Sequence, residues 1–209
     1  MKQGFVKVAA ATPDIRVADV PYNMKKICEA IEEAVQERAK ILVFPELCIT
    51  GYTCGDLFTQ EVLLRDAKAA LLKIAAFTAD KDILVFVGLP LCVDGKLYNV
   101  AAALNRGEVL GLTTKMFLPN YGEFYEMRQF TPGPDTAREI LFDGSLVPFG
   151  PQILFQATTM EELIVSAEIC EDVWSPIPPS IRAAMEGAVV IVNCSASDET
   201  IGKGRYRRE

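Results

Sequence analysis

The sequence contains no histidine, so the imidazole that most often activates a nucleophile is excluded, and so are the common zinc sites. Its six cysteines include no Cys-x-x-Cys pair, and we expect most of them to be reduced and buried. No apolar run approaches about 18 residues, and the first residues lack the apolar core of a signal peptide. These absences predict a cytoplasmic protein with no metal site and no membrane contact.

Positive charge is also scarce, because 21 lysines and arginines face 28 acidic residues. This balance argues against contact with a nucleic-acid backbone or with anionic lipid. A Gly-x-x-x-x-Gly-Lys-Ser/Thr phosphate loop is absent as well. With 209 residues, half of them apolar, the chain is long enough for one domain with a substantial core, and we assign residues 1–209 to that domain.

Short apolar runs alternate with amphipathic segments along the chain. The runs are typical of buried strands and cover residues 5–11, 41–44, 83–89, 97–104, 163–169 and 189–192. Helical spacing of apolar residues predicts helices over 22–39, 61–79 and 179–187, and 97–116 has the pattern of an antiparallel hairpin. The alternation predicts a layered α/β fold with a loop-rich stretch at 131–158. Residues 203–209 begin another helix with no closing strand after it, so we expect a domain truncated at its C-terminus.

Three candidate functional segments each follow an apolar run. Glu46 comes after 41–44 and Pro45, Cys170 follows 163–169, and residues 193–197 follow 189–192. Loops beyond the carboxyl ends of strands converge in α/β folds, so we expect Glu46 and Cys170 to be neighbours. The alternative is that Glu46 caps a helix or pairs with a surface lysine.

Cys170 lies among three carboxylates, which would raise the pKa of its thiol unless a cation lies nearby. Without histidine, its proton must pass to a carboxylate or a lysine. Lys115 is the only charged side chain between Glu108 and Glu123. Lys115 either covers apolar surface with its stem, leaving its ammonium in water, or lies beside Cys170 and stabilises negative charge there.

The segments that carry these residues resemble the signature blocks of the nitrilase, or carbon–nitrogen hydrolase, superfamily. In order, the blocks are Phe-Pro-Glu-Leu at 44–47 with Thr-Gly-Tyr at 50–52, Lys115 with 118–126, and Ile-Cys-Glu-Asp-Val-Trp at 169–174. The resemblance implies an α-β-β-α sandwich of mixed sheets flanked by helices. It also implies Glu46 as the base, Lys115 as its electrostatic partner and Cys170 as the nucleophile.

A narrower resemblance, to the N-terminal glutaminase domains of glutamine-dependent NAD synthetases, covers 51–58, 118–126, 193–197 and 202–203. It implies that L-glutamine is hydrolysed through a thioester and that the ammonia serves the amidation of deamido-NAD+. The positions it implies for the glutamine pocket are Tyr121, Glu126, Glu171, Trp174, Ser197 and Lys203. It further implies a homo-oligomer, and a synthetase domain, absent from these residues, that uses ATP and Mg2+; no cofactor is expected in the present domain.

Other functions remain open at this stage. The triad is shared across the superfamily, so a stand-alone amidase or nitrilase acting on another substrate fits it too. A non-catalytic nitrilase-like binding module is a further alternative, which an intact triad disfavours. A redox role for Cys170 is weaker, because no second cysteine lies within a few residues of it.

Overall fold

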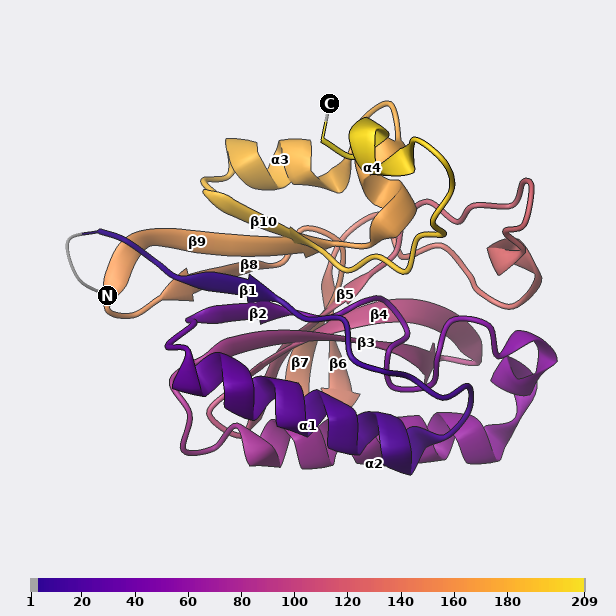
Figure 1. Cartoon of the computed structure of the whole chain (residues 1–209), viewed down its shortest axis with the longest axis horizontal. Helices are drawn as coiled ribbons and strands as arrows, with labels where there is room; N and C mark the ends of the chain where they lie inside the picture. The colour runs from indigo at the N-terminus through magenta and orange to yellow at the C-terminus, as the bar shows by residue number, and fades with distance from the viewer. Residues whose placement is uncertain (1–3, 209) are drawn as a thin grey trace.

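The computed structural model describes residues 4–208 and places the predicted apolar runs in two β-sheets (Figure 1). The larger sheet has the strand order β1-β2-β3-β4-β5-β7-β6, and the smaller one has the order β10-β9-β8. The strands of the larger sheet are β1 (Val8–Ala10), β2 (Ile41–Val43), β3 (Leu84–Val93), β4 (Lys96–Asn105), β5 (Glu108–Thr114), β6 (Arg138–Phe142) and β7 (Ser145–Gly150). The smaller sheet contains β8 (Leu154–Ala157), β9 (Met160–Glu168) and β10 (Val190–Asn193).

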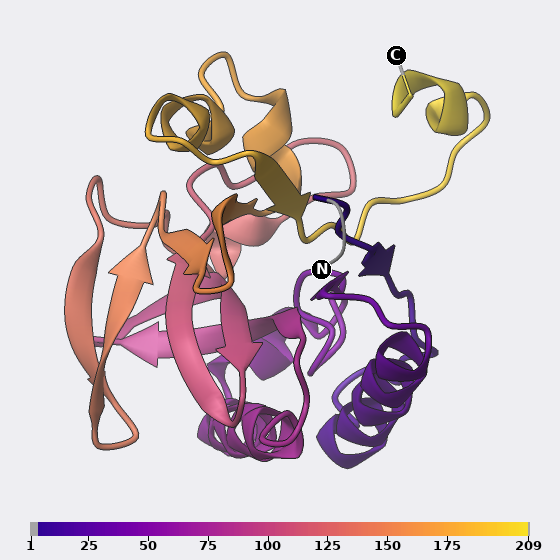
Figure 2. The same cartoon turned by 90° about the vertical axis from the view of Figure 1, so that its left-hand side faces the viewer.

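Helices cover the outer face of each sheet (Figures 1 and 2). The larger sheet carries α1 (Val20–Gln36) and α2 (Glu61–Phe77), whereas α3 (Pro179–Met185) packs on β9 of the smaller sheet. The Asp19 side chain caps α1 by accepting the N–H of Tyr22 at 3.2 Å, and Pro21 suits the first turn. A short last helix, α4 (Lys203–Tyr206), stands apart from both sheets in Figure 2. The predicted α-β-β-α sandwich is therefore confirmed.

Alternation along the central strands produces two apolar cores. On β3, Val85 and Val87 face the helices, whereas Phe86 faces the smaller sheet. There the rings of Phe86 and Phe155 pack edge to face, with 5.6 Å between the ring centroids. Because both faces of β3 and β4 are covered, these strands are apolar almost throughout, as the sequence pattern indicated.

The expectation of a loop-rich stretch at 131–158 was wrong, because β6, β7 and β8 lie within it. β6 and β7 form an antiparallel hairpin at the edge of the larger sheet and leave alternate residues, such as Leu141 and Leu146, exposed. Strands with one open face lack the continuous apolar run that reveals a doubly covered strand. Four of the six cysteines, Cys48, Cys54, Cys170 and Cys194, are buried as expected, whereas Cys92 is exposed.

The hairpin predicted within 97–116 is confirmed as β4 and β5, which makes β2 and β5 run in the same direction in one sheet. β9 and β10 are parallel to each other in the other sheet. The segments that follow these four strands meet at one end of the sandwich. Within residues 4–208, none of the helices has the length and hydropathy needed to span a membrane.

Candidate active site

Glu46 lies just beyond β2, and its side chain is completely buried. Its Oε2 accepts hydrogen bonds from Asn99 Nδ2 at 2.8 Å and from Lys115 Nζ at 2.8 Å. Its Oε1 accepts the backbone N–H of Ala196 at 3.1 Å. The backbone of Glu46 also approaches Gly88 of β3 so closely that a Cβ atom there would lie 2.6 Å from the Glu46 Cα. Glu46 therefore neither caps a helix nor pairs with a surface lysine.

Lys115, directly after β5, is also completely buried and lies between two carboxylates. Its Nζ is 2.8 Å from Glu46 Oε2 and 2.5 Å from Glu126 Oε1. Burial opposes the charged form of the lysine, but the charges of Glu46 and Glu126 outweigh this effect and raise its pKa. Lys115 therefore stays a cation inside the protein rather than covering apolar surface with its charge in water.

Glu126 begins a single 3-10 turn, Glu126–Arg128, and its side chain is buried. Besides Lys115, the hydroxyl of Tyr52 donates to Glu126 Oε1 at 2.8 Å. Burial raises the pKa of Glu126, and Lys115 opposes the rise. The structure thus places this predicted pocket residue against the lysine of the triad.

Cys170 begins a second 3-10 turn, Cys170–Trp174, beyond β9, and its backbone has the left-handed φ of 46°. Asn193 holds this conformation from both sides, because its Oδ1 accepts the N–H of Cys170 at 3.2 Å and its Nδ2 donates to the Cys170 carbonyl at 3.3 Å. Ser195 Oγ donates to the sulfur at 3.3 Å. Strain of this kind is common at functional sites.

The thiol of Cys170 is buried, and burial raises its pKa to about 12. Glu46 adds to the rise through its negative charge and a hydrogen-bond interaction with the thiol, and Lys115 opposes it. The three carboxylates next to Cys170 in the sequence have other partners. Glu171 accepts a hydrogen bond from the hydroxyl of Tyr121 at 2.9 Å, whereas the side chains of Glu168 and Asp172 accept hydrogen bonds from backbone N–H groups. Of the carboxylates near Cys170, Glu46 is thus the one that raises the pKa of its thiol.

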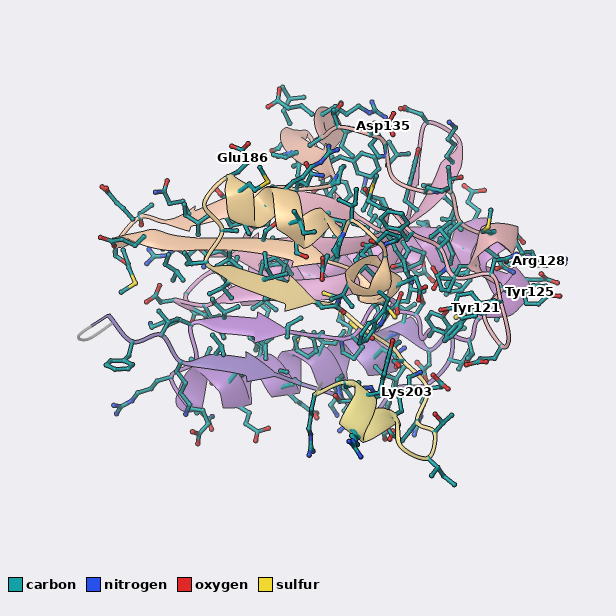
Figure 3. The ribbon with its side chains drawn as sticks, turned by 90° about the horizontal axis from the view of Figure 1, so that it is seen from above. Tyr121, Tyr125, Arg128, Asp135, Glu186 and Lys203 are labelled. Carbon is teal, nitrogen blue, oxygen red and sulfur yellow. The ribbon has the colours of Figure 1, made fainter. Side chains whose placement is uncertain are left out.

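The remaining predicted pocket residues lie nearer the surface. Tyr121 is exposed and lies far from Glu186 at the end of α3 in Figure 3. The ring of Trp174 stacks on that of Tyr206 of α4, with centroids 4.9 Å apart. Lys203 pairs with Asp198, and Ser197 Oγ donates to the Asp198 carbonyl at 3.4 Å. The structure thus places Ser197 and Lys203 on the partly buried C-terminal segment that also carries Ala196.

Sequence reasoning missed Asn99, which lies in the middle of β4 and is fully buried. The available signal was an amide inside an apolar run, since a buried polar side chain requires a partner. The hydroxyl of Ser195 and the N–H of Ala196 were also missed as contacts of Cys170 and Glu46. The sequence does not indicate which backbone N–H groups will bind a given side chain.

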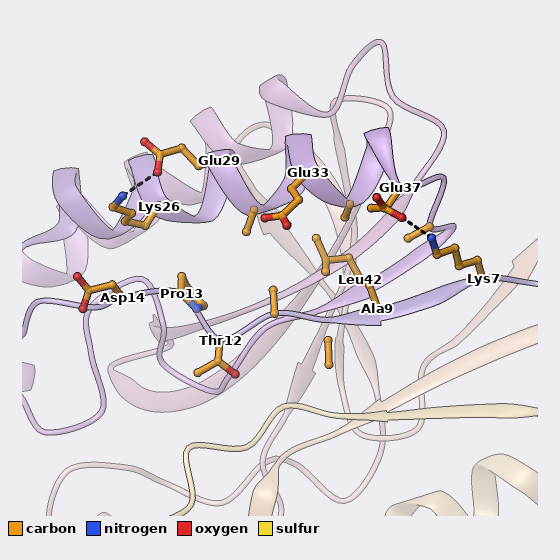
Figure 4. Close-up of a pocket in the computed structure, with 15 residues that line it drawn as sticks. Lys7, Ala9, Thr12, Pro13, Asp14, Lys26, Glu29, Glu33, Glu37 and Leu42 are labelled. Atoms are coloured by element: carbon orange, nitrogen blue, oxygen red, sulfur yellow. Dashed lines mark hydrogen bonds and ion pairs between the residues drawn. The ribbon is translucent and has the colours of Figure 1, made fainter.

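A separate cavity of about 550 Å³ lies between β1 and α1, and its lining includes Lys7, Lys26 and Glu33 (Figure 4). The predicted site residues are not among those that line it. Among residues 4–208, no cluster of three or more acidic or cysteine side chains is arranged to hold a metal ion.

Comparison with known proteins gives relatives of two kinds. The glutamine-dependent NAD(+) synthetase of Mycobacterium leprae is 39% identical over 206 residues, which are 99% of this chain and 30% of that protein. A crystal structure of a glutamine-dependent NAD(+) synthetase from Cytophaga hutchinsonii superposes with a TM-score of 0.86 at 34% identity, covering 97% of this chain and 32% of the other. An amidase from Nesterenkonia sp. AN1 superposes with a TM-score of 0.69 at 25% identity, covering 96% and 71%.

The chain therefore spans about 30% of the length of the synthetases it matches. Its resemblance to the carbon-nitrogen hydrolase family extends over residues 7–207, which is nearly all of it. The shared sandwich and the family match lead to one assignment: this chain belongs to the carbon–nitrogen hydrolase family.

Proposed function

We propose that this chain hydrolyses the side-chain amide of glutamine through a thioester on Cys170. The proposal rests on one observation. Glu46, Lys115 and Cys170 follow three different strands and lie together in the interior of the protein. The three groups supply a proton acceptor, a fixed positive charge and a nucleophile, which together suffice for amide hydrolysis.

In the first half-reaction, Glu46 takes the proton of the Cys170 thiol while the sulfur attacks the carbonyl carbon. The raised pKa of the thiol keeps it protonated beforehand, so proton transfer accompanies the attack. Of the three N–H bonds on the Lys115 ammonium, Glu46 and Glu126 take two. The third, together with the backbone N–H of Glu171, stabilises the oxyanion.

The nitrogen then leaves as ammonia after receiving the proton from Glu46, and the acyl group remains on sulfur as a thioester, which completes the first half-reaction. In the second half-reaction, Glu46 takes a proton from water, which attacks the thioester carbonyl and releases the acid. The thiol regains its proton at the end. One carboxylate therefore acts as the base in both halves, which accounts for a site without histidine.

Glutamine is the proposed substrate because the synthetases that match almost the whole chain are named as glutamine-dependent. In this proposal, Tyr121, Glu171, Trp174, Ser197 and Lys203 bind the amino-acid part of glutamine; in support, the hydroxyl of Tyr121 donates to Glu171, the residue that follows Cys170. A zwitterionic amino acid fits an entrance that offers both acidic and basic side chains.

We also propose that the chain acts as the glutaminase unit of an NAD synthetase. The ammonia would amidate deamido-NAD+ in a synthetase unit that uses ATP and Mg2+ and lies outside these 209 residues. A cytoplasmic location and a homo-oligomeric state belong to the same proposal. The match of the chain to about 30% of the synthetases supports it.

The test is mass spectrometry of the intact chain after exposure to 6-diazo-5-oxo-L-norleucine, a glutamine analogue that alkylates active-site thiols. We expect one adduct on Cys170, none in Cys170→Ala, and an unchanged adduct in Cys92→Ala, which removes the exposed cysteine. Excess glutamine should slow the labelling. Labelling that glutamine does not slow, or that maps to another cysteine, overturns the glutamine assignment.

An amidase acting on a simple amide is the second candidate. A mutant of the amidase from Nesterenkonia sp. AN1 is described as showing Michael addition of acrylamide at its active-site cysteine, and this chain covers 71% of it. Release of ammonia from glutamine, propionamide and acrylamide, measured side by side, separates the two candidates. Faster turnover of propionamide than of glutamine would favour the amidase.

A further inference from the structure

Asp172 is completely buried, and its carboxylate accepts three backbone N–H groups. Oδ1 accepts from Met116 at 3.0 Å and from Phe117 at 2.8 Å, and Oδ2 accepts from Ile169 at 3.0 Å. None of these bonds involves a reacting atom of the proposed chemistry. The role of this carboxylate must therefore come from the backbone that it holds.

The three donors belong to the two segments that carry catalytic groups. Met116 and Phe117 directly follow Lys115, and Ile169 directly precedes Cys170. The Lys115 segment leaves β5 of the larger sheet, whereas the Cys170 turn leaves β9 of the smaller one. One carboxylate thus joins the ends of two strands from different sheets, at the point where the charge of Lys115 reaches the thiol of Cys170.

On the Lys115 side, regular strand pairing ends at Thr114. The N–H of Lys115 still reaches the Asn99 carbonyl at 2.9 Å, and the Lys115 carbonyl accepts from Gly133 at 2.8 Å. The next two N–H groups are those that Asp172 accepts. Asp172 therefore accepts the backbone N–H groups that follow the last hydrogen bonds of β5 and Lys115.

On the Cys170 side, the bond to the Ile169 N–H fixes the residue before the left-handed Cys170. Burial raises the pKa of Asp172 to about 7, and the three N–H donors and the charge of Lys115 oppose the rise. A buried carboxylate is costly to keep unless its hydrogen bonds are satisfied, and here they are satisfied by the backbone of the site.

We infer that Asp172 is a positioning residue that fixes the Cys170 sulfur relative to the Lys115 ammonium by binding the backbone beside both. The inference rests on the proposed role of Cys170 as nucleophile. It predicts that loss of the Asp172 acceptors slows acylation while substrate binding at Tyr121 and Trp174 is retained. A displacement of about 1 Å between reacting groups is enough to cost roughly 100-fold in rate.

The test measures how fast 6-diazo-5-oxo-L-norleucine labels Cys170 as a function of its concentration in wild type and Asp172→Asn. The asparagine has nearly the same shape, but its Nδ2 cannot accept an N–H. We expect the maximal labelling rate to fall about 100-fold while the half-saturating concentration stays close to the wild-type value. Rates are expressed per folded molecule, from near-ultraviolet circular dichroism.

Asn23→Asp is the matched control. Asn23 is equally buried, and its side chain makes three hydrogen bonds to the backbone of Arg16 and Ile49, away from Cys170. This variant measures what the loss of a buried polar network does to stability alone, and its labelling rate per folded molecule should match that of wild type. A second variant, Asp172→Glu, keeps the charge and both acceptor oxygens but lengthens the side chain, and it should also label slowly.

The outcomes separate the inference from the proposed function. An Asp172→Asn or Asp172→Glu protein that labels at the wild-type rate per folded molecule overturns the positioning role and leaves the glutaminase proposal intact. A change in half-saturating concentration alone also overturns it, because that pattern assigns Asp172 to binding. If wild type is not labelled at Cys170, the proposed function fails and the inference falls with it.

Discussion

Gly88 of β3 lies against the backbone of Glu46 and Leu47, and this contact makes Gly88→Ala a sharp test of the site. A Cβ atom at Gly88 would lie 2.3 Å from the Leu47 nitrogen and 2.6 Å from the Glu46 Cα. Ordinary contacts between such atoms need roughly 3.5 Å, so one of the two segments must move by about 1 Å. β3 is held on both sides in the sheet, and we expect the Glu46 segment to move.

The expected result is loss of activity that exceeds the loss of stability. Overpacking of this kind costs about 1–3 kcal/mol of unfolding free energy. A shift of about 1 Å in Glu46, the proposed base, should lower kcat/KM for glutamine by roughly 100-fold or more. The assay is release of glutamate, corrected for the folded fraction obtained from urea denaturation of the same preparation.

Gly111→Ala provides the control for a methyl group added elsewhere in the sandwich. At Gly111 of β5 the added Cβ would lie 3.0 Å from the ring of Phe155 and 3.3 Å from Ile153, both in the core between the sheets. This variant should lose stability but keep its activity per folded molecule. If Gly88→Ala also keeps wild-type activity per folded molecule, the reasoning about Glu46 is refuted.

Three further predictions concern the charges of the site. Because the pKa of Cys170 is raised to about 12, its thiol is protonated at neutral pH. The rate of its alkylation by iodoacetamide should therefore rise about tenfold per pH unit between roughly pH 7 and 9, and a plateau in that range would contradict this pKa. Asn99→Leu removes a donor to Glu46 worth about 1.5–3 kcal/mol, and kcat for glutamine should fall at least tenfold in the glutamate assay; an unchanged kcat would exclude this role. Lys115→Met leaves two buried carboxylates without a cation and should cost about 3–5 kcal/mol in urea denaturation, most of it recovered by adding Glu46→Gln and Glu126→Gln; a triple variant as unstable as the single one would disprove this account.

The placement of Glu46, Lys115 and Cys170 could be predicted from the sequence because each residue follows an apolar strand. The carboxyl ends of similarly directed strands meet at one end of the fold, so a residue just past such a strand is placed near the others. The structure refines the prediction in one respect. Glu46 and Lys115 come from the larger sheet and Cys170 from the smaller one, so the site lies between two sheets rather than at the edge of one.

The supporting contacts could be predicted less well. Asn99 bonds to Glu46, and Asp172 bonds to Met116 and Phe117, all more than 50 positions away, and local periodicity does not predict such pairs. The left-handed Cys170 gives no signal either, because positive φ is expected from glycine rather than cysteine. What the sequence does offer is a polar residue where the pattern demands an apolar one, and Asn99 within β4 is such a case.

The absence of histidine can now be connected with the charges of the site. Glu46, Glu126 and Lys115 together bring an excess of negative charge next to a buried thiol, and burial and Glu46 both favour the protonated sulfur. An imidazole base could form an ion pair with a thiolate before substrate arrives, whereas a carboxylate base beside a protonated thiol makes proton transfer part of the attack. Lys115 then has two tasks that a neutral side chain could not fulfil. It offsets the two carboxylates before the reaction, and in the proposed mechanism it meets the oxyanion when the proton of Cys170 reduces the charge on Glu46.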